Sequence, residues 1–222
     1  MKAKGYGFSV VGGREMNQDS FLVNDERALY AVADGVGGGM KGEVASKMAI
    51  DGLQELATGP SERLSTIFQR LQKRVYGQAM QEFGEPVMGT TLTAVRMSET
   101  DVTVCHAGDS RCYLFTQSVL RLLTEDHEFY DERVQGTVLS SYMGLPEDVH
   151  PLTVTEETLP LTSGDRILLC SDGLYRQIQE SRIAELIRQN LDDTPKLVQL
   201  LCEEAARKEH SDNVTVIVIE IA

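Results

Sequence analysis

The chain has 222 residues, of which 41% are hydrophobic, and it carries a formal net charge of −13. This length and composition suit a single domain spanning residues 1–222, and no apolar run reaches the roughly 18 residues of a membrane span. The acidic balance argues against nucleic acid as a partner, because that binding depends on Lys and Arg neutralising phosphates. Since no apolar leader follows Met1, we expect a cytoplasmic protein that contacts neither membrane nor nucleic acid.

Short runs of β-branched and aromatic residues predict strands in the first half of the chain. Their ranges are 6–11, 20–33 with a turn at 24–25, 90–97, 102–107 and 111–115. Apolar residues at helical spacing predict two helices between the second and third of these runs, one after Gly42 and one after Ser61. Only turns separate the last three runs, so we expect those strands to pair as antiparallel neighbours.

The second half of the chain begins with a polar, irregular stretch at 124–151. The patterns that follow are, in order, strand 152–158, strand 165–170, helix 180–190 and helix 195–208. The final run, 213–221, is apolar at both alternations and predicts a strand buried on both faces. Because strands come in runs and helices in pairs, two stacked antiparallel sheets covered by helices fit better than a doubly wound parallel sheet.

Single aspartates stand where buried strands begin or end. Asp34, Asp109 and Asp172 each follow an apolar strand, and Asp212 precedes the last one. If the last strand runs antiparallel to its neighbours, its start lies at the sheet edge where theirs end, and the four carboxylates converge on one rim. Turn chemistry explains any one of these residues but is a weak explanation of the whole set.

Carboxylates that converge are costly to a fold unless cations are present. Two of them about 4 Å apart repel by roughly 4 kcal/mol at an effective dielectric constant near 20. Oxygen ligands without Cys or His select hard ions such as Mg²⁺, Mn²⁺ or Ca²⁺, and Gly35 leaves bare backbone that can lend a carbonyl. Two ions that share a carboxylate activate water for attack at phosphorus. The guanidinium of Arg14 suits a phosphate clamp.

Other patterns carry weaker signals. The segment 37–42 matches the dinucleotide fingerprint GxGxxG, which we reject because Asp34 would repel a pyrophosphate and no strand-end acid follows about 20 residues later. The four cysteines form no CxxC pair, so we expect reduced core thiols. His106 and His127 are better explained as structural residues than as catalytic ones.

Seven motifs follow one another along nearly the whole chain. They are REMNQDS (14–20), ADGVGGGMKGEVAS (33–46), MGTTLTA (88–94), HAGDSRCYL (106–114), LTEDH (123–127), GDRILLCSDGL (164–174) and SDNVTVIV (211–218). In this order they resemble the metal-dependent protein phosphatases of type 2C, and in particular the bacterial members of that family. The resemblance implies an αββα sandwich with a binuclear manganese or magnesium centre. It also implies hydrolysis of phosphoserine and phosphothreonine in proteins by metal-activated water, without a phosphoenzyme.

The resemblance assigns ligands by position. It implies that Asp34 bridges the two ions, that Gly35 contributes a carbonyl, and that Asp172 and Asp212 bind the second ion. Asp109 together with Asp172 resembles the pair that holds a third, weaker ion in bacterial relatives.

Two further positions match residues that act beside the metals. Asp19 matches an acid that often acts through a water. Arg14 matches the phosphate-binding arginine, so Asp34, Asp172 and Arg14 form the expected catalytic set. The implied substrates are phosphorylated proteins, in particular those of a eukaryotic-like Ser/Thr kinase, and we expect a monomer.

Two departures from the family pattern bear on activity. Gly39 stands where bacterial relatives usually carry a histidine proposed as a general acid. The flap is short, with only residues 128–139 between the EDH and SSYMG segments. These departures leave open an alternative, in which the chain is a catalytically weak or inactive relative that binds metal or phosphoprotein as a regulator. A calcium-stabilised structural domain is a third hypothesis.

Overall fold

The computed structural model describes residues 2–36, 41–59, 62–148 and 150–222. The helices are α1 (Gly42–Leu56), α2 (Leu64–Phe83), α3 (Asp172–Tyr175), α4 (Glu180–Gln189) and α5 (Thr194–Ala206). The strands are β1 (Ala3–Val10), β2 (Asp19–Asn24), β3 (Leu29–Asp34), β4 (Leu92–Met97), β5 (Asp101–Ala107), β6 (Arg111–Thr116), β7 (Val119–Leu122), β8 (Glu128–Asp131), β9 (Gly136–Leu139), β10 (Thr155–Pro160), β11 (Arg166–Cys170) and β12 (Val214–Ile221). Among these helices, none is both long and apolar enough to cross a bilayer.

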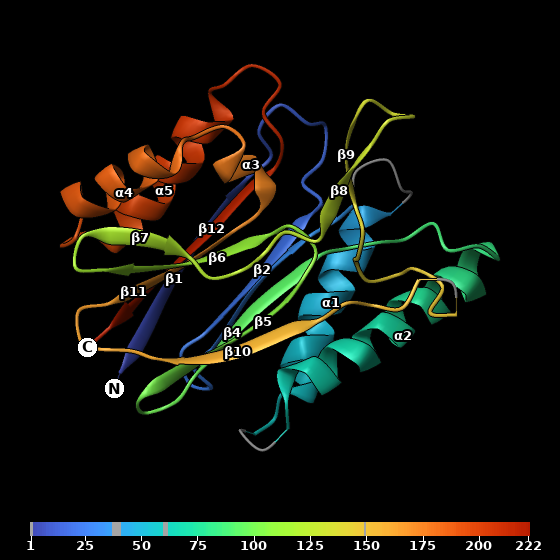
Figure 1. The fold of residues 1–222 in the computed structure, drawn as a ribbon, viewed down its shortest axis with the longest axis horizontal. Helices are drawn as coiled ribbons and strands as arrows, with labels where there is room; N and C mark the ends of the chain where they lie inside the picture. Colours follow the sequence, from blue (N-terminus) through green and yellow to red (C-terminus); the bar gives the residue numbers. More distant parts are fainter. Residues whose placement is uncertain (1, 37–40, 60–61, 149) are drawn as a thin grey trace.

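Most of the strands form two five-stranded sheets. One has the strand order β1-β12-β11-β6-β7 and the other β10-β5-β4-β3-β2, and every neighbouring pair in them is antiparallel. Helices α4 and α5 lie on the outer side of the first sheet, and α1 and α2 lie on the outer side of the second (Figure 1). The αββα sandwich predicted from the sequence is therefore confirmed.

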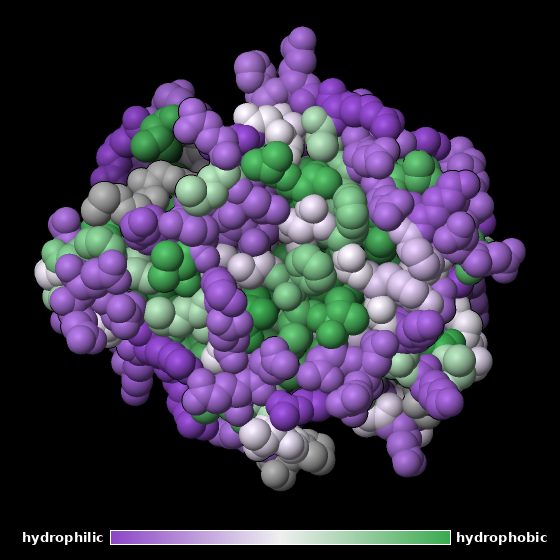
Figure 2. All heavy atoms as spheres, turned by 180° about the vertical axis from the view of Figure 1, so that it is seen from behind, coloured by the Kyte–Doolittle hydropathy of each residue, from purple (hydrophilic) through white to green (hydrophobic). Residues whose placement is uncertain are grey.

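The two-residue period of the strands produces the layers. In β12, Val216 and Val218 pack into the cluster beneath α4 and α5, whereas Ile217 and Ile219 pack into the cluster between the two sheets. All four are completely buried, so the prediction of a strand buried on both faces is confirmed. Apolar side chains thus concentrate in inner layers, and hydrophilic side chains cover much of the face seen in Figure 2.

The sheet topology brings the strand-end aspartates together. Strands β3 and β5 both pair antiparallel with β4, so they run in the same direction and end at the same edge, where Asp34 and Asp109 lie. In the other sheet β11 runs antiparallel to β12. Asp172 after β11 and Asp212 before β12 therefore share an edge as well. Packing of the two sheets places these edges around one cavity.

The structure differs from the sequence-based expectation in several elements. The stretch 124–151 contains the hairpin β8–β9, β7 was not predicted, and β10 begins at Thr155 rather than at residue 152. The two hairpin strands have four residues each and leave Phe129 and Tyr130 exposed, so burial imposes no alternation that a sequence would reveal. The short helix α3, which Asp172 begins, was also not predicted.

Candidate active site

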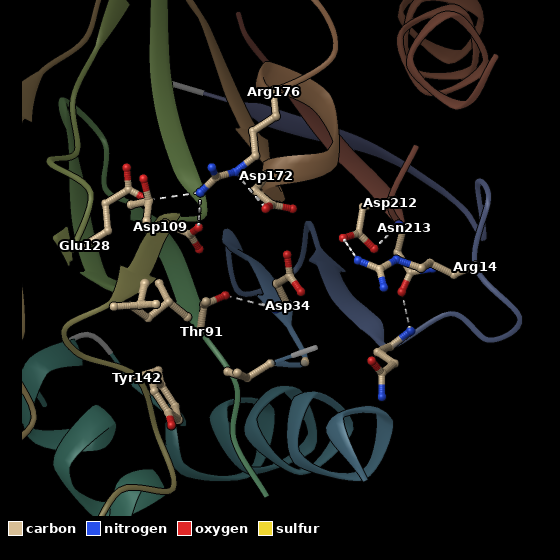
Figure 3. A pocket seen from close by; sticks show the side chains of 16 residues that line it. Arg14, Asp34, Thr91, Asp109, Glu128, Tyr142, Asp172, Arg176, Asp212 and Asn213 are labelled. Carbon is tan, nitrogen blue, oxygen red and sulfur yellow. Dashed lines mark hydrogen bonds and ion pairs between the residues drawn. The ribbon is translucent and has the colours of Figure 1, made fainter. Parts of the chain in front are cut away.

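A cavity of about 490 Å³ opens between the two sheet edges and the β8–β9 hairpin. Its lining includes six of the residues predicted or weighed above, namely Arg14, Asp34, Gly35, Asp109, Asp172 and Asp212. Figure 3 shows the side chains of Arg14 and the four aspartates converging from different elements. Asp19 does not line this cavity, but it lies beside Asp34 in the β2–β3 ladder. The structure thus brings the four strand-end aspartates to one cavity.

Two consecutive threonines fix the backbone of Asp34 at the end of β3. The Asp34 main-chain N–H donates to Thr91 Oγ1 at 3.0 Å, and the Asp34 carbonyl accepts from Thr90 Oγ1 at 2.9 Å. Desolvation raises the pKa of the Asp34 carboxyl group well above its usual value, and the charges of the neighbouring carboxylates, Asp19 and Asp172 foremost, raise it further. Asp34 is therefore the centre of a negative field that favours a cation.

Asp19 is held behind Asp34 by hydroxyl groups of the other sheet. Its Oδ2 accepts hydrogen bonds from Ser171 Oγ at 2.8 Å and from Thr215 Oγ1 at 2.6 Å. Its Oδ1 is buried and has no hydrogen-bond partner among the residues that the structure describes. Desolvation raises the pKa of Asp19 to about 6, against the hydrogen bonds from these hydroxyls. A buried carboxylate oxygen without a partner is the kind of group that a cation or an ordered water satisfies.

Asp172 and Asp109 form the second acidic pair of the cavity. Asp172 opens α3, and burial together with the charge of Asp109 raises its pKa to about 7. Burial also raises the pKa of Asp109, while Arg176 opposes the shift. Arg176 contacts both carboxylates, at 2.9 Å from Asp172 Oδ2 and 3.0 Å from Asp109 Oδ2.

Asp212 is paired with Arg14 across the mouth of the cavity. Arg14 Nη2 lies 2.5 Å from Asp212 Oδ2, and the Arg14 side chain is more than half exposed. The neighbouring Asn213 anchors the segment that carries Arg14. Its Oδ1 accepts from the Gln18 N–H at 2.8 Å, and its Nδ2 donates to the Met16 carbonyl at 2.9 Å. Arg14 is thus an exposed cation on a fixed loop, facing the acidic floor.

Gly35 has no room for a side chain. A Cβ atom there would lie 2.5 Å from the Gly42 carbonyl group and 2.8 Å from the Gln18 carbonyl oxygen. The Gly35 N–H donates to that Gln18 oxygen at 3.2 Å. The backbone therefore turns closely past the start of α1, as the bare segment after Asp34 suggested. Gly39, the position of the expected histidine, lies outside the described residues.

The structure adds lining residues that the sequence analysis did not assign, of which Glu128, Tyr142 and Arg176 are examples. Arg176 carried a readable signal, because it stands four residues after Asp172, the spacing of a helical ion pair. Glu128 and Tyr142 belong to or follow the unpredicted hairpin, and no local pattern places them at the cavity.

Two of the sequence hypotheses concern histidines near the cavity. His106 is buried, with Nδ1 2.8 Å from Thr93 Oγ1 and Nε2 3.1 Å from the Glu125 carbonyl oxygen. Burial lowers its pKa to about 4, so it is a neutral structural residue at physiological pH, as expected. His127 Nδ1 accepts from the Gly108 N–H at 3.2 Å and so ties the segment between β7 and β8 to the turn after β5.

The donors of the cavity suit hard divalent ions in type. Its acidic groups are carboxylates, and the described lining residues include neither histidine nor cysteine. Within the described part of the chain, no three Asp, Glu, His or Cys side chains are grouped as a ready ligand cluster. Asp212 and Asp172 instead point to Arg14 and Arg176. The donor chemistry and the raised pKa values fit bound cations, and the two arginines offset part of the negative charge.

Comparison with known proteins places this chain in a family. A model of the protein phosphatase 2C family matches residues 7–212, so the chain belongs to that family. The serine/threonine phosphatase stp of Listeria monocytogenes is 31% identical, over 93% of this chain and 91% of its own length.

Solved structures of phosphatases have the same fold as this chain. The structure of PppA from Pseudomonas aeruginosa superposes with a TM-score of 0.88 at 28% identity, covering 100% of this chain and 99% of that one. The catalytic domain of the phosphatase PstP, solved with two manganese ions, gives a TM-score of 0.81 at 29% identity, covering 99% of this chain and 98% of that one. The chain is a metal-dependent protein serine/threonine phosphatase, and the sequence-based function is confirmed.

Proposed function

We propose that the cavity is the catalytic centre of this phosphatase, and that Asp34, Gly35, Asp172 and Asp212 hold two divalent ions, manganese or magnesium, at its floor. The supporting observation is the convergence of these residues on one cavity, with Asp34 in the field of the other carboxylates. Such ions supply an activated water and offset the charge that develops on phosphorus oxygens. Asp34 is central because its carboxylate lies between the acids of both sheet edges (Figure 3).

Arg14 is proposed to bind the substrate phosphate. Its guanidinium is exposed at the cavity mouth and pairs with the carboxylate of Asp212. When Asp212 is engaged elsewhere, Arg14 presents two parallel N–H donors that match two oxygens of a phosphate monoester. Asn213 keeps the Arg14 loop in place through the change, because its hydrogen bonds go to backbone groups rather than to Arg14.

Asp19 is proposed to act behind the floor rather than as a direct ligand. Its Oδ2 is already engaged by Ser171 and Thr215, which leaves one oxygen for a water. Substrates are phosphorylated proteins, as for the named relatives. We further propose that they are products of a eukaryotic-like Ser/Thr kinase, and that the chain works in bacterial signalling as a cytoplasmic monomer. In this proposal residues 1–222 form one catalytic domain with a shortened flap at 128–139.

The test compares Asp34→Asn with a matched surface change, Asp51→Asn. Asp51 lies on α1, is exposed and pairs with Lys47 outside the cavity. Hydrolysis of p-nitrophenyl phosphate and of a phosphothreonine peptide is measured with Mn²⁺ and with EDTA. We expect Mn²⁺-dependent turnover in the native chain and in Asp51→Asn, and its loss in Asp34→Asn. Equal turnover in the two variants, or turnover that survives EDTA, contradicts the assignment of the cavity.

A further inference from the structure

Arg176 sits among three carboxylates that come from separate parts of the chain. Its Nε lies 2.9 Å from Asp172 Oδ2, and its Nη2 lies 3.0 Å from Asp109 Oδ2 and 2.9 Å from Glu128 Oε2. These acids belong to α3, to the turn between β5 and β6, and to the first residue of β8. Figure 3 shows the guanidinium reaching across the top of the cavity toward Asp109, Asp172 and Glu128.

The surroundings of Arg176 hold it in this position. The preceding residue, Tyr175, donates a hydrogen bond from its hydroxyl group to the Asp109 carbonyl oxygen at 3.2 Å. The guanidinium of Arg111 stacks over the Tyr175 ring at 3.6 Å, and Arg111 is itself paired with Asp126 at 2.7 Å. These contacts fix the backbone on the N-terminal side of Arg176. They therefore hold the Arg176 side chain where it contacts the three carboxylates.

The carboxylates around Arg176 form a site that suits a cation. Asp109 is almost fully buried, and its charge needs a positive partner. Arginine keeps its charge at every relevant pH, and the fork formed by Nε and Nη2 addresses two carboxylates at once. A divalent ion between Asp109 and Asp172 would have to displace this guanidinium or bear its repulsion at close range.

We propose that the guanidinium of Arg176 is a built-in cation that takes the place of a third divalent ion between Asp109 and Asp172. The inference rests on the proposed two-ion centre and deepens it, because it sets the number of ions that the cavity holds. It reverses the expectation, drawn from resemblance, that Asp109 and Asp172 together hold a weaker third ion. In this protein Asp109 acts as a positioning residue for Arg176.

The experiment counts bound Mn²⁺ per chain by titration, using the electron paramagnetic resonance signal of free Mn²⁺. We expect two ions on the native chain. Arg176→Ala should bind a third, weaker ion, and the double variant Arg176→Ala with Asp109→Asn should return to two. The matched control is Arg182→Ala. The Arg182 side chain is 39% exposed against 42% for Arg176, and it also bridges two acids, Glu185 and Glu204, but away from the cavity.

The outcomes separate this inference from the proposed function. The role of Arg176 is overturned if the native chain binds three ions. It is also overturned if the native chain and folded Arg176→Ala both bind two. Neither result contradicts the two-ion centre. If the native chain binds no Mn²⁺, both the two-ion centre and the role of Arg176 are overturned. Asp109→Asn in an otherwise native chain gives an answer even where Arg176→Ala fails to fold. We expect it to keep two ions, and a loss of one ion relative to the native chain counts against the inference.

Discussion

Asp172 gives a quantitative test of the electrostatics of the cavity in the absence of metal. Its pKa rises from 3.8 to about 7 in the folded chain, mainly because the carboxyl group is buried and faces Asp109. Between these two values the folded state holds a proton that the unfolded state has lost. The stability of the metal-free protein should therefore fall as pH rises from about 4 through about 7, and should be greatest below the unfolded pKa.

The perturbation is Asp172→Asn, which keeps the shape of the side chain and removes its charge. A shift of about three pKa units corresponds to about 4 kcal/mol. We expect about half of this, about 2 kcal/mol, to appear as added stability above pH 7, because Asn loses the ion pair with Arg176. For a chain of this length that gain corresponds to a rise in Tm of about 4–8 °C.

The assay is thermal unfolding in EDTA at pH 8 and at pH 4, followed by circular dichroism. At pH 8 the variant should melt above the native chain, and at pH 4 the two curves should converge, because the native carboxyl group is then protonated in the folded state. A variant that melts at or below the native temperature at pH 8 would refute the reasoning. Asp51→Asn, at an exposed acid outside the cavity, serves as the control and should leave Tm nearly unchanged at both pH values.

Three further predictions concern activity. Asp172→Asn should lower Mn²⁺-dependent turnover of p-nitrophenyl phosphate by about 100-fold or more while keeping its far-ultraviolet circular dichroism, since it removes a proposed ligand of an ion that activates water; near-native rates would remove Asp172 from the centre. Arg14→Ala should raise KM for a phosphothreonine peptide by about tenfold or more, because a charge-assisted hydrogen bond contributes about 1.5–3 kcal/mol, and an unchanged KM would exclude Arg14 as the clamp. Removal of divalent ions by chelation should abolish hydrolysis, and added Mn²⁺ should restore it; Ca²⁺ restoring stability but no turnover would instead favour a structural role for the cations.

The sequence was sufficient for the parts of the fold that burial dictates. The double alternation of 213–221 predicted β12, which is buried on both faces because it lies between a helical layer and the opposing sheet. Strand-end aspartates were visible for a similar reason. A lone carboxylate after an apolar run marks the point where the chain leaves the core, and antiparallel pairing then brings such points to one edge.

Elements that depend on exposed or long-range contacts were missed. The hairpin β8–β9 pairs mainly with itself and leaves Phe129 and Tyr130 in solvent, so its residues show no buried face. The spacing of Arg176 from Asp172 is a local signal, but the other two partners of Arg176 could not be predicted from the sequence. Its local partner Asp172 stands four residues away, but Asp109 and Glu128 come from segments 67 and 48 residues distant.

The residue pattern alone therefore determined the layered fold and the acidic rim, because core burial and charge crowding leave periodic or clustered signals along the chain. The class of reaction was indicated by the resemblance of the chain's seven motifs to the type 2C phosphatases. Tertiary structure alone decided which cation each carboxylate meets. Ion pairs such as Arg14 with Asp212 and Arg176 with Asp109 join residues far apart in sequence, and an arginine side chain is long enough to reach several acids. Only the packing of sheets, α3 and hairpin around the cavity selects among them.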